Sequence, residues 1–359
     1  MNNLKHLTVI CVQLLLIFLV SISCKEDETV NPPIPGTDYS KGIFVVNEGK
    51  FADGTGTITH FTRQDMAATY DLFQEKNGLP LGNVAQSLNQ IGNTGFIIVN
   101  NANLIWIVTM KNFRIKGVVN SVNLPRYLVE AGPGKVYVTS WDNKVAIVDY
   151  LSAQKVGEIP VGTGPEKMLT VGEQTWVLNQ GGFSIDSTIT VIDNISDQVD
   201  RTIAVYPRPS GIQVDKSGNV WVICSGHGWN GFPAPGDSEG HLLCISPSND
   251  EVITDIAFPD AVKHPEKLVI NESGDILYYM MPDGIYKQEI TSTSLESSPL
   301  ISKSGLYGLG YDHVEKMIYV SDAVDFSQNG WIYRYNPTTG ELVSSHQAGI
   351  VPGEFYFAN

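Results

Sequence analysis

The sequence predicts an all-β fold, a seven-bladed β-propeller that is closed by a C-terminal innermost strand joining three N-terminal strands. Three observations predict it: a lead-in segment that recurs seven times, β-rich strands after most copies, and complementary content at the two chain ends. The 359 residues include 34 Gly, 19 Pro and 42% apolar residues, which excludes a wholly disordered chain. A pair of β-sandwiches and a six-bladed ring are the alternatives that we consider.

The lead-in segment passes from a turn, often with Pro, into an apolar strand. Its seven copies are Val84–Leu88, Pro125–Leu128, Pro165–Leu169, Pro209–Ile212, Pro265–Leu268, Leu306–Leu309 and Pro352–Phe355. Their starting residues are 40 to 56 positions apart, a period close to that of a four-stranded propeller blade. We therefore expect each copy to begin the innermost strand of one blade.

Further short strands follow six of the copies, with β-branched and aromatic residues between Gly, Asp, Asn and Pro. The expected second strands are Gly95–Val99, Lys135–Thr139, Gln174–Leu178, Asn219–Cys224, Asp275–Met280 and Met317–Val320. The expected third strands are Leu104–Thr109, Lys144–Asp149, Thr188–Asp193, His241–Ile245 and Trp331–Tyr335. No segment of 12 or more residues keeps a helical apolar period.

The two ends of the chain predict how the ring closes. The seventh copy, Pro352–Phe357, ends the chain without further strands. Three strands without a lead-in segment stand at the other end, at Gly42–Val46, Thr57–Phe61 and Ala68–Phe73. We expect the C-terminal strand to pair with them, which leaves few exposed strand edges.

The N-terminal segment is typical of an exported lipoprotein. Lys5 precedes the apolar stretch Leu7–Val20, and Ser21–Cys24 follows and resembles a bacterial lipobox. A membrane-spanning helix is the alternative, although the stretch is shorter than the about 20 residues that a span needs. We expect a signal peptide at residues 1–23, a flexible linker at 24–40 that is lipidated at Cys24, and the propeller at 41–359. The acids after Lys25 resemble an export signal for the cell surface, so the predicted location is the outer membrane, by lipid anchor only.

The charge and motif content excludes several classes of function. The formal charge is −15 and no run of Lys or Arg occurs, so a nucleic acid is a poor partner. We find no HExxH or P-loop motif, and the spacing of Cys and His indicates no metal site. We predict a non-enzyme without cofactor, catalytic residue or metal. Cys224 and Cys244 lie on expected neighbouring strands, and a disulfide forms if they face each other.

Two metal-dependent alternatives stay open from the residues alone. His227 lies in a loop with aromatic residues and is a possible metal ligand, although a turn histidine explains it as well. Some propellers are calcium-dependent lactonases, and such a set could here be formed by Glu48, Asn101, Asn179 and Asp325.

The predicted site lies where loops gather on one face of the ring. These are the loops that lead into the innermost strands and those between second and third strands. They carry amides, which donate and accept hydrogen bonds, beside aromatic rings, which cover an apolar plane. The candidate ligand-binding residues are Asn101, Arg126, Trp141, Gln180, Phe183, Trp229, Phe232, Tyr307, Asp325, Phe326 and Gln328. A large, mostly uncharged ligand suits this mixture.

Several stretches resemble the BtuG-type surface propellers, within the broader YncE-like family. They are Leu81–Ser87, Val99–Asn101, Leu124–Tyr127, Tyr137–Thr139, Asp322–Phe326 with Gly330, and Gly349–Gly353. The resemblance implies a lipidated capture protein for cobalamin or another corrinoid, which passes the vitamin to a TonB-dependent outer-membrane transporter. On this hypothesis amides meet the polar arms of the corrin, aromatic rings pack on its plane, and Arg126 and Tyr307 line the channel mouth. A siderophore, haem, or a protein-docking envelope scaffold without a small ligand are the alternatives.

Overall fold

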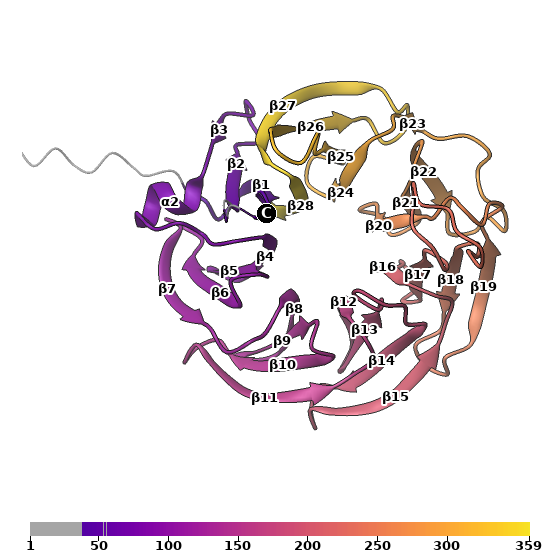
Figure 1. Ribbon diagram of the computed structural model, residues 1–359, viewed down its shortest axis with the longest axis horizontal. Coiled ribbons are helices and arrows are strands. Elements are labelled where there is room, and N and C mark those ends of the chain that lie inside the picture. The colour runs from indigo at the N-terminus through magenta and orange to yellow at the C-terminus, as the bar shows by residue number, and fades with distance from the viewer. Residues whose placement is uncertain (1–37, 53, 55) are drawn as a thin grey trace, which may run out of the picture. The chain divides into compact units, whose positions relative to one another are not determined.

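The computed structural model describes residues 38–52, 54 and 56–359, and within them the fold is a seven-bladed β-propeller, as the sequence predicts. Seven four-stranded antiparallel sheets stand radially around one axis (Figure 1). The predicted signal peptide, lipidation site and most of the linker lie outside the described residues. Among the described residues no helix is both long and apolar enough to cross a membrane.

Every blade is built from an innermost, a second, a third and an outermost strand. The innermost strands are β28 (Pro352–Ala358), β4 (Ala85–Ile91), β8 (Pro125–Gly132), β12 (Pro165–Val171), β16 (Pro209–Val214), β20 (Glu266–Ile270) and β24 (Leu306–Asp312), for blades 1 to 7. In the same order the second strands are β1 (Gly42–Asn47), β5 (Thr94–Val99), β9 (Lys135–Ser140), β13 (Gln174–Asn179), β17 (Val220–Cys224), β21 (Ile276–Met281) and β25 (Met317–Asp322). The third strands are β2 (Thr57–Phe61), β6 (Leu104–Thr109), β10 (Lys144–Asp149), β14 (Thr188–Asp193), β18 (His241–Ile245), β22 (Gly284–Glu289) and β26 (Asn329–Tyr335). The outermost strands are β3 (Ala68–Thr69), β7 (Arg114–Val119), β11 (Gln154–Pro160), β15 (Gln198–Ala204), β19 (Val252–Ala257), β23 (Ile301–Ser302) and β27 (Leu342–Ile350).

The ring is closed by its two ends, as predicted. The C-terminal strand β28 pairs with β1 in antiparallel register, from Gly42 opposite Ala358 to Val45 opposite Phe355. Figure 1 shows β28 at the centre of the ring beside β1, with β2 and β3 outside them. The first blade therefore joins residues from both ends of the chain, and β1 lies between β28 and β2 and is not left as a free sheet edge.

The predicted strand Ala68–Phe73 is wrong over most of its length. Only Ala68–Thr69 forms a strand, β3, and the chain then enters a short helix, α2 (Leu72–Asn77). Asp71 adopts a left-handed backbone with φ 45°, which ends the strand and turns the apolar pair Leu72 and Phe73 inward. Both side chains are fully buried, so the apolar run that indicated a strand covers the blade as a helix instead.

The core consists of layers between neighbouring blades, because each sheet buries both of its faces. Along β9, Val136 and Val138 pack with blade 2, whereas Tyr137 between them packs with Met168 and Val177 of blade 4. The alternation of side chains along a strand produces this division. The loops and channel residues described below therefore rest on a core that is packed around the whole ring.

The two cysteines do not form a disulfide. Cys224 lies opposite His241 and Cys244 opposite Trp221, which is an offset of three residues. An odd offset places two side chains on opposite faces of a sheet, and both thiols are buried and free, in different core layers. Burial raises the pKa of the Cys244 thiol to about 12, so it is unreactive at neutral pH.

Candidate ligand-binding site

The channel of the ring is shaped by a β-bulge at the start of every innermost strand. In all seven blades the pairing between the innermost and second strands shifts register at this point. A bulge places two successive residues opposite one and re-aims their side chains. The two residues at this place, here called the channel pair, are Gln86/Ser87, Arg126/Tyr127, Glu166/Lys167, Ser210/Gly211, Glu266/Lys267, Tyr307/Gly308 and Gly353/Glu354.

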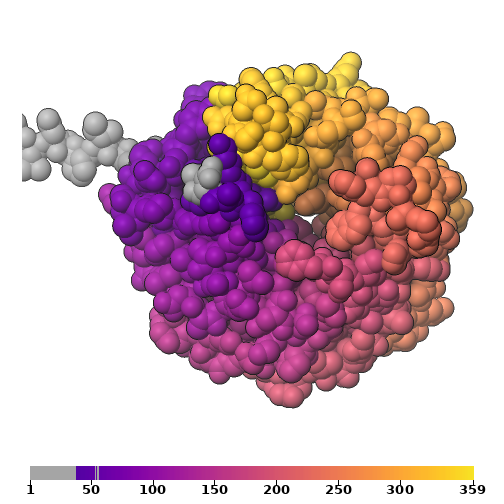
Figure 2. Space-filling view, in the orientation of Figure 1, coloured from indigo at the N-terminus to yellow at the C-terminus, as the bar shows by residue number. Residues whose placement is uncertain are grey.

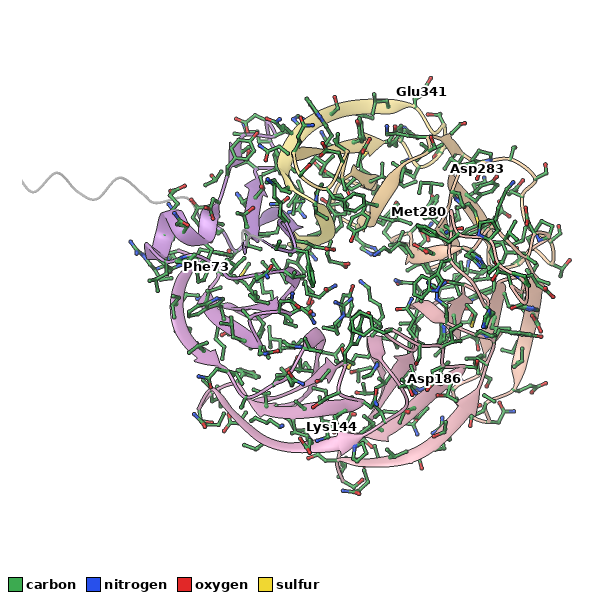
Figure 3. All side chains as sticks on the ribbon, in the orientation of Figure 1. Phe73, Lys144, Asp186, Met280, Asp283 and Glu341 are labelled. Carbon is green, nitrogen blue, oxygen red and sulfur yellow. The ribbon has the colours of Figure 1, made fainter. Side chains whose placement is uncertain are left out.

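The residue before most innermost strands has a left-handed backbone. Its φ is 58° at Val84, 43° at Leu124, 55° at Gly164 and 57° at Arg208, with similar values at Gly305 and Val351. Non-glycine residues adopt this conformation at a cost, so tertiary packing must stabilise it. Figure 3 shows nitrogen- and oxygen-tipped side chains projecting from the innermost strands into the centre of the ring.

The first residues of the channel pairs in blades 2 to 4 form a hydrogen-bonded network with a tryptophan from a loop. Arg126 donates from Nε and Nη2 to both oxygens of Glu166, at 2.8–3.1 Å, and from Nη1 to Gln86. The indole Nε1 of Trp141 donates to the same carboxylate at 3.1 Å, and the guanidinium lies 4.1 Å from the centre of the indole ring. Glu166 is only 5% exposed, so one buried carboxylate orients both the cation and the aromatic ring.

Phe183 extends this arrangement outward. Its ring meets that of Trp141 edge to face, with centroids 5.0 Å apart, and Phe183 itself is 91% exposed. The structure thus brings together three predicted site residues, Arg126, Trp141 and Phe183, around one carboxylate that sequence reasoning missed. The signal for Glu166 was its place in the lead-in segment, one blade after Arg126.

A second group gathers on the same face at blades 7 and 1. The hydroxyl of Tyr307 donates to Glu48 at 2.9 Å, and its ring meets Phe326 edge to face at 5.5 Å. Burial raises the pKa of Glu48 above its usual range, although the bond from Tyr307 acts against this. Burial and the charge of Glu48 also raise the pKa of Tyr307, which keeps the phenol neutral.

The long loop of residues 225–240 carries a third group. Trp229 and Phe232 are exposed, and the ring of Trp229 lies over the guanidinium of Arg208 at 3.7 Å. Arg208 is 2% exposed and donates from Nη1 to the carbonyl of Gly228. Its position directly before Pro209 could have identified it, but the sequence analysis did not select it.

The remaining predicted residues do not take part in these three groups. Asp325 accepts the backbone N–H groups of Ser327 and Gln328 and the side-chain amide of Gln328, the last at 2.8 Å. These bonds lower the pKa of Asp325, and they order the loop rather than aim either side chain at a ligand. Asn101 and Gln180 are half-buried in loops of the same face, between second and third strands.

The described residues give no support to a metal centre. Among residues 38–52, 54 and 56–359 no group of three or more His, Cys, Asp and Glu side chains could hold a metal ion. Asn179, a member of the lactonase-like set, is fully buried, and its amide donates to Thr188 and Thr190 at 2.9 Å. His227 is half exposed, with Nδ1 3.9 Å from a carboxylate oxygen of Asp237.

A large cavity, which the sequence analysis did not predict, lies at the other end of the channel. It has a volume of about 1240 Å³ and is lined by innermost strands and by the turns that leave them, among them Gly132–Pro133 and Gly172–Glu173. We call the end with these turns the turn face and the end with the predicted loops the mouth face. Figure 2 shows the ring hollowed at its centre. Tyr127, Lys167 and Glu354 line the cavity on its side toward the channel network.

Residues 41–358 match a family described as a domain of unknown function, DUF5074. No curated protein matches the chain in sequence. Solved propellers are similar in structure: a quinonprotein alcohol dehydrogenase-like protein from Bacteroides thetaiotaomicron has a TM-score of 0.68 at 15% identity, over 90% of this chain and 79% of that one. The periplasmic gluconolactonase of Pseudomonas aeruginosa has a TM-score of 0.65 at 10% identity, over 89% and 99%. At these identities the likeness extends to the fold alone.

Proposed function

Since the chain belongs to the DUF5074 family, whose domain is here a seven-bladed propeller, we propose that it is a non-catalytic binding protein for a bulky nutrient. The proposed ligand is cobalamin or a related corrinoid, bound at the mouth face. The supporting observation is the arrangement of Arg126, Glu166, Trp141 and Phe183, in which a buried carboxylate orients a cation and two aromatic rings beside the channel. A preformed site of this kind loses little conformational entropy when a ligand binds.

The exposed aromatic residues of the mouth face add to this support. Phe183 is 91%, Phe232 78%, Phe326 55% and Trp229 47% exposed. Exposed apolar side chains that gather on one face mark a contact site. A corrin is a large ring edged with amide arms, so its plane fits aromatic rings and its edge fits Asn101 and Gln180.

The cellular part of the proposal rests on the sequence. The lipidated Cys24 would hold the protein on the outer membrane at the cell surface, where it passes the corrinoid to a TonB-dependent transporter. Replacing Cys24 by Ser should release the protein from membranes into the soluble fraction on cell fractionation. Retention of the variant in the membrane fraction would disprove the anchor without affecting the ligand.

Calorimetric titration of the purified protein with cyanocobalamin tests the ligand. We expect saturable heat at micromolar concentrations together with quenching of tryptophan fluorescence. Trp141→Ala should weaken binding about 10-fold, as expected when an aromatic contact worth 1–2 kcal/mol is lost. Leu151→Ala is the matched control, because Leu151 is 78% exposed but lies in a turn between a third and an outermost strand.

Three results would contradict the proposal. Absence of heat and quenching would remove cobalamin as the ligand, and equal weakening by Trp141→Ala and Leu151→Ala would remove the mouth face as the site. Hydrolysis of a lactone that stops when divalent ions are chelated would replace binding by catalysis.

A further inference from the structure

A small recess opens from the channel between the innermost strands of blades 4 to 7 and β28. Its volume is about 180 Å³, and polar groups from four strands face it: Lys167, Ser210, Lys267 and Glu354. The recess shares Lys167, Glu354 and neighbouring residues with the cavity of about 1240 Å³ at the turn face. A small group could therefore occupy the recess while the rest of a molecule lies in the larger cavity.

Lys267 differs from its counterparts in the other blades. In six blades the left-handed residue precedes the innermost strand, whereas in blade 6 the left-handed residue is Lys267 itself, with φ 55°. The register shift between Glu266 and Leu268 makes this lysine the bulged residue of β20. Backbone strain at a charged residue in a channel is typical of a functional position.

The ammonium group of Lys267 has no ion pair in the described part of the chain. Lys167 is neutralised by Glu354 at 2.6 Å, and its ammonium also lies 4.2 Å from the centre of the Tyr127 ring. Glu266, the residue before Lys267, has the amide of Asn230 at 3.5 Å. The lining of the recess holds two ammonium groups, of Lys167 and Lys267, and one carboxylate, of Glu354, which pairs with Lys167.

The surroundings of Lys267 keep it charged. Burial acts to lower its pKa, but Tyr127 first and then the charges of Glu354 and Glu266 oppose this, and the pKa of Lys267 is raised overall. Tyr127 also faces it and is neutral at pH 7, because burial raises the pKa of that phenol. A charged ammonium that makes no direct ion pair among the described residues can bind an anion that enters the channel.

We infer that this recess binds the anionic group, a carboxylate or a phosphate, of a small molecule that enters from the turn face. Lys267 supplies the charge, Lys167 also lines the recess, and the hydroxyl of Ser210 donates a hydrogen bond. The Ser210 oxygen accepts a hydrogen bond from the Ser225 hydroxyl at 2.9 Å, and its own proton makes only a long bond of 3.4 Å to the carbonyl of Ile223, so that proton can turn toward the anion. This site lies apart from Trp141 and Phe183 and does not depend on the proposed function.

Thermal unfolding of the purified protein with inorganic phosphate or acetate, each against sodium chloride of equal ionic strength, tests the inference. We expect a saturable rise in the melting temperature with phosphate, acetate or both, because a ligand that binds only the folded state stabilises it. Comparison of the two anions distinguishes a phosphate from a carboxylate site. Lys267→Met should reduce the apparent affinity for the anion at least 10-fold, whereas Lys267→Arg should retain most of it.

Lys263→Met is the matched control, because Lys263 is a surface lysine whose side chain is 55% exposed. It should leave the response to both anions unchanged. The inference is overturned if sodium chloride reproduces the rise, if neither anion gives one, or if Lys267→Met responds as the parent protein does. If Lys267→Met does not fold, Lys267→Gln and Lys267→Arg are compared instead. Loss of the anion-induced rise in melting temperature in Lys267→Gln, with its retention in Lys267→Arg, supports the site, and an equal rise in both variants rejects it. Cyanocobalamin plays no part in these measurements, so failure of one proposal is distinguishable from failure of the other.

Discussion

Replacement of Glu166 by Gln tests whether one carboxylate holds the mouth of the channel together. The variant keeps the shape of the side chain but removes its charge, so Arg126 and the indole of Trp141 lose an anionic acceptor. Arg126 has a side chain that is 14% exposed and Glu166 one that is 6% exposed. Because both side chains are mostly buried, bulk water cannot take the place of either partner. The variant therefore leaves the mostly buried guanidinium of Arg126 without the carboxylate that binds it.

The magnitude follows from the geometry. At 2.8 Å and an effective dielectric constant of about 20, the gross attraction between the two charges is about 6 kcal/mol. Desolvation cancels part of this attraction, and breaking buried pairs usually costs about 3–5 kcal/mol. The amide of the variant still accepts hydrogen bonds, so we expect Glu166→Gln to lower the free energy of unfolding by about 2–4 kcal/mol.

A double-mutant cycle isolates the pair. Urea unfolding of Glu166→Gln, Arg126→Met and the double variant, followed by tryptophan fluorescence, should give a coupling energy of about 2 kcal/mol or more. Glu158→Gln is the control, because its carboxylate binds Lys144 and Lys155 at the surface. A coupling energy below about 0.5 kcal/mol, the value of an exposed pair, would refute the idea that Glu166 orders the mouth.

Three further predictions concern closure, backbone and pH. Phe355→Ala in β28 should lower the free energy of unfolding by about 3–5 kcal/mol, because Phe355 packs on Tyr319. The control Leu342→Ala lies on an exposed outermost strand and should have little effect. Equal denaturation midpoints for the two variants would contradict closure of the ring by β28. Gly164→Ala should lower the midpoint far more than Gly172→Ala, since the two glycines have φ of 55° and 60° but only the first would place a Cβ atom 2.0 Å from a backbone nitrogen. Glu48→Gln should be more stable than the parent at pH 7, because a carboxyl whose pKa is raised on folding destabilises the folded state once it is ionised. The difference in the free energy of unfolding should vanish as the pH falls below the unfolded pKa of about 4.5. A difference that grows on acidification would contradict a raised pKa of Glu48.

The ring and its closure were predictable because their signals are local and repeated. Leu104–Thr109, Lys144–Asp149 and Thr188–Asp193 form strands with the predicted bounds. Each is an apolar run between turn residues and is buried on both faces. The outermost strands of blades 2 to 7 were not predicted, since exposed polar residues interrupt their apolar pattern and β23 has only two residues. Ala68–Phe73 failed for the related reason that a short apolar run can cover a sheet as a helix as well as extend it.

The candidate site was predictable in its residue types but not in its contacts. Trp141 and Phe183 stand in loops that the repeat alone places on the mouth face, and the structure brings them together. The partner of Arg126 could not be assigned, because Glu166 and Glu48 both lie near the channel and only the packing of adjacent blades selects one. Gln328 looked available for a ligand, yet the carboxylate of Asp325 binds its amide. The orientation of the two cysteines likewise depends on a register that alternation does not determine.

The bulge at the start of the innermost strands explains why one repeat can serve two ends of a channel. In a regular strand, two successive side chains would point to opposite faces of the sheet. The bulge turns a pair of them toward the channel: Arg126 contacts Glu166 and Trp141 of the mouth face, whereas Tyr127 and Lys167, each the next residue along, line the cavity of the turn face. In blades 3 and 4 the first members of the channel pairs, Arg126 and Glu166, thus orient the mouth, and the second members, Tyr127 and Lys167, line the cavity. Substitutions in one set can change recognition at one end while the backbone that supports the other end stays in place.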